Sequence, residues 1–154
     1  MTTAQKKSPD VLKKWISEGK VDTVILGFCD MQGRLVGKRF TAGHFVTIME
    51  KGAHFCDYLL GTDIEMTTPE GFAVVGWDKG YGDWTAKPDW DTLRLIPWLE
   101  KSALILADVV DEEGTLVEIA PRSVLKRQLT RAAKKGFELQ MASELEFYLI
   151  RETY

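Results

Sequence analysis

The sequence predicts an α+β fold, in which a small sheet is accompanied by helices. Apolar residues recur at helical spacing over residues 9–18 and again over 121–135. Between these segments, short runs rich in β-branched and aromatic residues are separated by turn-forming residues. With 154 residues, 45% of them hydrophobic and 28% charged, the chain is long enough to bury a core of its own.

The first third of the chain predicts a helix, a β-hairpin and a second helix. Pro9 favours the first turn of a helix, and Gly19 is expected to end it. The runs 21–29 and 34–40 are β-rich and flank a turn that contains Asp and Gly. Thr41 then suits the N-cap position of a short helix.

The middle of the chain predicts a long loop followed by more strands. Glycines, prolines and tryptophans are frequent over residues 61–90, which is typical of loops. We expect strands at Leu93–Ile96 and Ser102–Asp108, and a further strand at Thr115–Ile119 after an acidic turn. The sheet is therefore expected to continue beyond the loop.

The last third predicts a helix and one long strand. Pro121 begins an amphipathic helix that Gly136 should end. Over Phe137–Ile150 apolar residues alternate with polar ones, which predicts a strand with one apolar face.

Charge and composition exclude several classes of protein. The formal net charge is −3, so the clustered positive surplus that nucleic acid binding requires is not expected. No apolar run approaches the roughly 18 residues of a membrane span, and the N-terminus does not resemble a signal peptide. The two cysteines, Cys29 and Cys56, are too few for a disulfide framework and are expected to pack as small hydrophobic residues. We expect a cytoplasmic protein.

Two carboxylates stand out on the last predicted strand. Glu144 and Glu146 lie two residues apart, so both side chains leave the same face with Cα atoms about 7 Å apart. Carboxylates at this spacing can bind hard divalent cations such as Mg²⁺. The alternative is the solvated side of an amphipathic strand, which the spacing by itself does not exclude. A glycosidase-type acid pair is disfavoured, because its carboxylates must face each other across a bond.

Several motifs occur in a fixed order along the chain. They are Pro88-Asp89, Thr92-Leu93-Arg94, Pro97-Trp98, Ala103–Asp108, Pro121-Arg122-Ser123-Val124-Leu125 and Ser143-Glu144-Leu145-Glu146-Phe147-Tyr148-Leu149. In this order they resemble the glutamine synthetase family, except that Ala120 stands where the family's helix start usually has Asp. The hairpin of residues 21–39 is similar to the family's N-terminal β-grasp domain. The resemblance therefore covers nearly the whole chain.

The resemblance implies a fold and an activity. It implies a β-grasp domain over residues 1–115, followed over 116–154 by a helix and the first strand of the half-barrel catalytic domain. In the family, ATP phosphorylates the side-chain carboxylate of glutamate, and ammonia or another amine displaces the phosphate in a step of nitrogen metabolism. Glu146 would hold the Mg²⁺ or Mn²⁺ ion nearer the amino acid, and Glu144 the ion that serves ATP. The intact enzymes self-associate into ring-like homo-oligomers.

The resemblance also implies a catalytic aspartate, which reaches into the site of a neighbouring subunit and helps to bind and deprotonate ammonium. The usual F-D-G-S-S pattern is missing from the corresponding loop, residues 55–66. Asp63 or Asp57 could take its place, and Asp63 is favoured because Leu-Leu-x-x-Asp-Ile resembles family members that use larger amines. The alternative is a turn-forming aspartate. The departure makes an acceptor other than ammonium a possibility.

The family's enzymes are considerably longer than this chain, which has no candidates for the remaining metal ligands or for the ATP and glutamate pockets. We therefore expect the 154-residue chain to be inactive by itself, and to self-associate through unpaired strand edges. An alternative is a non-catalytic binding or structural module, with the glycine- and tryptophan-rich loop 76–84 as its contact surface.

Overall fold

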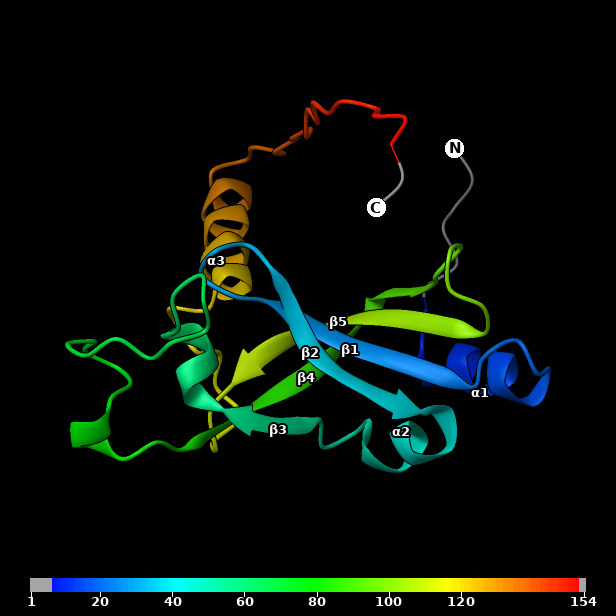
Figure 1. The fold of residues 1–154 in the computed structure, drawn as a ribbon, viewed down its shortest axis with the longest axis horizontal. Coiled ribbons are helices and arrows are strands. Elements are labelled where there is room, and N and C mark those ends of the chain that lie inside the picture. Colours follow the sequence, from blue (N-terminus) through cyan, green and yellow to red (C-terminus); the bar gives the residue numbers. More distant parts are fainter. Residues whose placement is uncertain (1–6, 153–154) are drawn as a thin grey trace.

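The computed structural model describes residues 7–152, which form one curled sheet with helices (Figure 1). The elements in chain order are α1 (Pro9–Ser17), β1 (Thr23–Cys29), β2 (Leu35–Thr41), α2 (Ala42–Ile48), β3 (Ala53–Cys56), the 3₁₀ turns Asp57–Leu60 and Trp77–Lys79, β4 (Asp83–Leu95), β5 (Ser102–Val110) and α3 (Pro121–Lys134). The α+β class predicted from the sequence is confirmed.

The sheet has the strand order β2-β1-β5-β4-β3. β1 pairs in parallel with β5, while the other neighbours are antiparallel. The β4–β5 pairing shifts register between Asp89 and Arg94. Thr92 stabilises this bulge, because its hydroxyl donates to the carbonyl of Asp89 (2.6 Å) and accepts from the amide of Leu106 (2.8 Å).

The core lies between one face of the sheet and the first two helices. Leu12 of α1 and Phe45 of α2 are completely buried against alternate residues of β1 and β5. The sheet is curled, since the rings of Phe28 in β1 and Phe55 in β3 lie 4.3 Å apart although two strands separate them in the sheet. The edge strands β2 and β3 are therefore brought toward each other.

The N-terminal helix, the hairpin, the second helix and α3 lie where the sequence predicts them. Thr41 is at the N-cap of α2 but its side chain makes no capping hydrogen bond. The short strand β3 was not predicted, and β4 begins at Asp83, inside the segment predicted as loop. The strand predicted at Thr115–Ile119 is reduced to a single bridge between Val110 and Leu116. Cys29 and Cys56 are free and half-buried.

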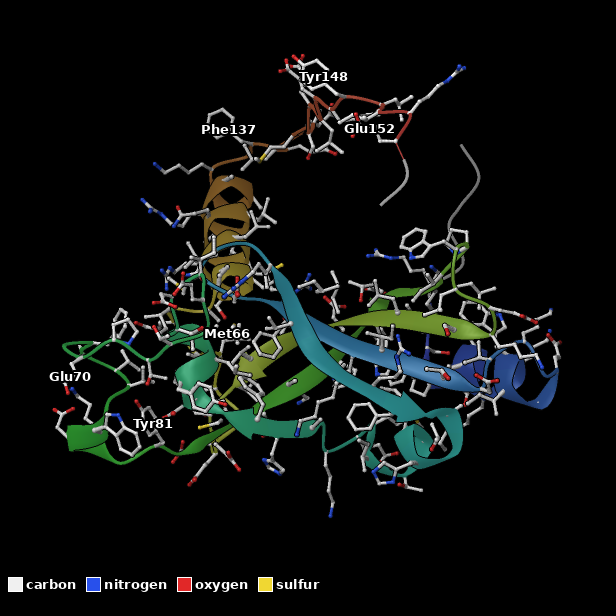
Figure 2. All side chains as sticks on the ribbon, in the orientation of Figure 1. Met66, Glu70, Tyr81, Phe137, Tyr148 and Glu152 are labelled. Carbon is white, nitrogen blue, oxygen red and sulfur yellow. The ribbon has the colours of Figure 1, made fainter. Side chains whose placement is uncertain are left out.

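The prediction of a long strand at Phe137–Ile150 is wrong for this chain. After α3 the described residues form no regular secondary structure and are exposed throughout (Figure 2). A strand is stabilised by hydrogen bonds to a neighbour, and no strand of the described residues pairs with this segment. Its apolar and polar side chains are exposed alike; Leu145 is 83% exposed and Tyr148 94%.

None of the described helices has the length and hydropathy that crossing a bilayer requires.

Candidate functional site

The tip of the β1–β2 hairpin holds a neighbouring loop through one arginine. Arg34 donates from Nη1 to the carbonyl oxygen of Ile64 (2.7 Å) and from Nη2 to that of Asp63 (3.0 Å). Gln32, two residues earlier, donates from Nε2 to the carbonyl of Thr62 (2.9 Å). Side chains of the hairpin therefore bind three consecutive carbonyls of a loop about thirty residues away in sequence.

Asp30 fixes both the hairpin turn and the arginine. One carboxylate oxygen accepts from the amides of Gln32 (3.0 Å) and Arg34 (2.8 Å), and the other accepts from Arg34 Nε (2.6 Å). The carboxylate is only 1% exposed. Burial raises the pKa of Asp30, but its hydrogen bonds with Arg34 and Gln32 outweigh this effect and hold the pKa below its ordinary value.

The turn that the sequence predicts between the runs 21–29 and 34–40 is observed, and the side chain of Asp30 stabilises it. Asp is common at the start of such turns, because its side chain can accept hydrogen bonds from backbone amides a few residues later in the chain. The contact between Arg34 and residues 63–64 leaves no local sequence signal, because it joins segments that are distant in the chain.

Asp63 closes a tight turn with its own side chain. One carboxylate oxygen accepts from the amides of Glu65 and Thr67 (both 2.9 Å), and the other accepts from the hydroxyl of Thr67. Met66 adopts a left-handed conformation, with φ of 65°, to complete the turn. The hydrogen bonds from Thr67, together with the Glu65 amide and the nearby Arg34 charge, lower the pKa of Asp63.

The turn-forming alternative for Asp63 is thus observed. Its carboxylate can still accept a hydrogen bond from a further donor. An ionised carboxylate has about four lone-pair positions, of which the hydrogen bonds within the turn use three. The side chain is half-buried at the molecular surface and ionised at neutral pH. It can therefore accept a further donor such as an ammonium group.

Asp57, the other candidate, has a structural role. It is 9% exposed and joins the loop to the start of β4, since its backbone amide donates to the carbonyl of Gly82 (3.0 Å) and its carboxylate accepts from the amide of Gly82 (3.1 Å). The structure therefore holds Asp57 inward and leaves Asp63 nearer the surface.

A cleft of about 350 Å³ lies between the hairpin tip and the loop. Its wall is mostly apolar and includes Met31, Phe72, Val75 and Ile119, with Thr62 next to Asp63 in the chain. Such a wall suits the hydrocarbon part of a small ligand better than a bare ion.

The glycine- and tryptophan-rich segment forms the outer part of the same loop. Trp77 is 74% exposed and meets Tyr81 edge to face at 5.1 Å, and Tyr81 meets Tyr58 in the same way at 5.8 Å. Lys79, between Trp77 and Tyr81 in the chain, donates from Nζ to the carbonyl of Phe72 (2.8 Å). Figure 2 shows Tyr81 and Glu70 in this outer part, well away from the core of the sheet.

Glu144 and Glu146 lie in the irregular segment after α3, and Figure 2 shows this segment, marked by Phe137 and Tyr148, well apart from Met66 in the loop that contains Asp63. Both are exposed, and neither takes part in an ion pair within residues 7–152. No group of three or more His, Cys, Asp or Glu side chains able to hold a metal is present in that part of the chain.

A four-residue ion-pair network, not foreseen from the sequence, attaches α3 to the sheet. Arg122 pairs with Asp89 and with Asp108 (Nε to Oδ1, 3.0 Å), and Lys126 pairs with the same two carboxylates. Asp89 lies in the motif Pro88-Asp89, and Arg122 lies in the motif that begins at Pro121. These two motifs were the sequence signal for the network. The network fixes the start of α3 against β4 and β5.

Comparisons with known proteins agree on one family. A family model described as "Glutamine synthetase, catalytic domain" matches residues 118–154. Gamma-glutamylethanolamide synthetase GlnA4 of Streptomyces coelicolor is 47% identical over 140 residues, which is 90% of this chain and 30% of that protein. A glutamate–isopropylamine ligase of a Pseudomonas species is 32% identical over 154 residues, covering 99% of this chain and 34% of the ligase.

A solved structure described as a GmaS/ADP complex has a similar fold. The superposition has a TM-score of 0.64 at 26% identity and covers 83% of this chain and 26% of that one. The chain therefore spans about a third or less of the length of the proteins it matches.

Proposed function

The chain belongs to the glutamine synthetase family, and from this premise we propose that it is the N-terminal portion of a ligase that joins glutamate to an organic amine. The observation that carries the proposal is the 47% identity to a gamma-glutamylethanolamide synthetase, together with 32% identity to a glutamate–isopropylamine ligase. In domain terms, residues 1–115 form a β-grasp domain and 116–154 begin the catalytic domain. The family model, which matches from residue 118, supports this boundary.

The reaction has two steps. An oxygen of the glutamate side-chain carboxylate bonds to the γ-phosphorus of ATP, and the bond from that phosphorus to ADP breaks. The ammonium form of the amine loses one proton and its nitrogen bonds to the acyl carbon. The carbon–oxygen bond to phosphate breaks, and a second N–H proton passes to the departing phosphate. The products are a γ-glutamyl amide, ADP, phosphate and a proton.

Glu144 and Glu146 are proposed to hold Mg²⁺ or Mn²⁺ in this ligase. Carboxylate oxygens are ligands that both ions prefer, and both side chains are exposed and outside any described ion pair. As the family resemblance implies, Glu146 serves the ion nearer glutamate and Glu144 the ion nearer ATP. A divalent cation held by these two carboxylates would neutralise the charge that spreads over the transferring phosphoryl group.

Asp63 is proposed to bind the amine. Its lowered pKa keeps the carboxylate negative, which favours contact with an ammonium cation. We assign Asp63 to holding the amine and, as the family resemblance implies, to helping remove its proton. The apolar cleft beside Thr62 supports an amine with a hydrocarbon part as the acceptor in place of ammonium.

The test is an amine panel on the protein at its native length. ADP release is measured with glutamate and ATP in the presence of ethanolamine, isopropylamine, methylamine or ammonium. We expect at least one organic amine to give a higher kcat/KM than ammonium. Equal rates with and without every amine would overturn the proposal and favour the binding-module alternative.

The metal assignment has its own test with a matched control. Glu144→Gln and Glu146→Gln each remove a charge from the proposed ligand pair and should reduce activity by about 100-fold or more. Glu138→Gln removes a charge from the same segment and should leave activity within about twofold. A loss of equal size in all three variants contradicts the assignment.

We also propose that the ligase acts in the cytoplasm as a ring-like homo-oligomer. Support comes from exposed apolar side chains after α3, such as Leu145 and Phe147, which need a partner surface. Sedimentation velocity of the 154-residue chain should show concentration-dependent association. A strictly monomeric profile from about 1 to about 100 μM would contradict it.

A further inference from the structure

We propose that Arg34 is a positioning residue for the amine, and that Asp30 cancels its charge at that site. The inference rests on the proposed function, in which Asp63 holds the amine. It assigns a role in the ligase reaction to the β1–β2 hairpin tip, which contains no candidate for the chemistry itself.

The first step of the argument is the geometry of the loop. The carbonyls of Thr62, Asp63 and Ile64 accept hydrogen bonds of 2.9, 3.0 and 2.7 Å from Gln32 and Arg34. Fixing the carbonyls on both sides of the Asp63 Cα atom fixes the peptide planes next to it. The direction in which the Cβ atom of Asp63 leaves the loop is therefore set from the hairpin, and the hydrogen bonds within the turn then hold the carboxylate.

The second step is that these contacts require the planar, forked guanidinium group of an arginine. Arg34 reaches Asp30 through Nε while Nη1 and Nη2 reach two different carbonyls, so three of its nitrogens are used at once. A lysine carries one compact ammonium group on a flexible stem and cannot span these three acceptors. An Arg34→Lys variant keeps the positive charge but cannot make all three of these contacts at once.

The third step concerns charge. A cation bound at Asp63 would be repelled by an unpaired guanidinium that contacts the carbonyl of the same residue. Asp30, buried and 2.6 Å from Arg34 Nε, supplies the compensating negative charge. The hairpin can thus hold the loop with an arginine and still present a net negative site to an ammonium group.

The test compares Michaelis constants in the protein at its native length. Arg34→Lys should raise KM for the best amine of the panel about 10-fold, because hydrogen bonds that hold the loop are lost. KM for ATP and for glutamate should stay within about twofold. The control Arg39→Lys, at an exposed arginine of β2, the strand that begins directly after Arg34, should change none of the three.

Asp30→Asn separates the charge effect from the geometric one. It should raise the amine KM by several-fold at low salt, and the increase should shrink at about 0.5 M NaCl because the uncompensated charge is then screened. A purely structural role for Asp30 would not produce this salt dependence. Gln32→Met, which removes the bond to the Thr62 carbonyl, is a milder variant that should raise the amine KM about threefold if Asp30→Asn fails to fold.

The outcomes distinguish this inference from the proposed function. Wild-type protein without amine-dependent activity overturns the proposed function and this inference with it. An active wild type whose Arg34→Lys variant keeps the amine KM within about twofold, or raises all three KM values equally, overturns the inference alone.

Discussion

The Nζ atom of Lys38 in β2 lies 2.6 Å from the carbonyl oxygen of His54 in β3, although these strands form the two opposite edges of the sheet. The hydrogen bond spans the open side of the curled sheet and complements the Phe28–Phe55 contact inside it. The curl in turn positions the hairpin tip and the loop that begins after β3, where Asp63 lies.

Lys38→Met should therefore loosen the closure of the sheet. We expect the free energy of unfolding to fall by about 1 kcal/mol, the usual net value of one hydrogen bond, because the apolar stem keeps its packing while the donor is lost. Urea denaturation of the 154-residue chain measures this change. Lys51→Met, an exposed lysine after α2, is the control and should stay within about 0.5 kcal/mol. Equal effects of the two substitutions would contradict the closure role.

Acid should weaken the hairpin tip through Asp30. Its pKa lies below the ordinary value of 3.8 in the folded protein, so its contribution to stability is present above that pH and is lost as pH falls through the folded-state pKa. Asp30→Asn should lower the free energy of unfolding by about 1–3 kcal/mol near neutral pH. The gap between wild type and variant should narrow below pH 3.8.

Urea denaturation at a series of pH values tests this prediction, with Asp10→Asn as the control. Asp10 is exposed and its described ion pair, with Lys13, is long at 3.8 Å. Its substitution should have a small effect at every pH. If the stability difference between wild type and the Asp30→Asn variant were the same from about pH 2 to about pH 6, the carboxylate charge of Asp30 would not be what stabilises the turn.

The sequence predicted those elements whose signals are local. Pro9 and Pro121 with Gly136 mark helix ends wherever the rest of the chain lies. β3 has only four residues, too few for alternation to be recognised, and it is a strand because β4 pairs with it. In the segment Phe137–Ile150 apolar and polar residues alternate, but no strand of the described residues pairs with it. The alternation therefore predicted a strand where none forms.

The candidate site was predictable only in part, for the same reason. Glu144 and Glu146 stand out by their spacing, but only the family resemblance supplied a role for them and for Asp63, and these roles remain predictions. The contact of Arg34 with residues 63–64 depends on how the curled sheet places two distant segments together. Residue spacing carries no information on such a contact.

The ion-pair network at the start of α3 should contribute to the docking of that helix. Arg122→Met leaves Asp89 and Asp108, 20% and 18% exposed, with Lys126 as their shared partner. Because the single positive charge of Lys126 then faces two partly buried carboxylates, we expect the free energy of unfolding to fall by about 2 kcal/mol. Arg127→Met, at an exposed position of the same helix, is the control and should cost less than about 0.5 kcal/mol. If both variants melt alike, the network does not hold the helix.

Gly37 should be the least replaceable glycine of the sheet. It pairs with Gly27 across β1 and β2, and a Cβ atom at this position would lie 2.0 Å from the carbonyl oxygen of Leu26 and 2.8 Å from the Cα of Gly27. Both are backbone atoms, so the strands must separate to make room, and Gly37→Ala should cost about 2–4 kcal/mol. Gly43→Ala is the matched control, because a Cβ there meets nothing within 4 Å and alanine favours the helix by up to about 1 kcal/mol. Urea denaturation should therefore give changes of opposite sign, and a Gly37→Ala variant as stable as wild type would mean that β1 and β2 are not packed this closely.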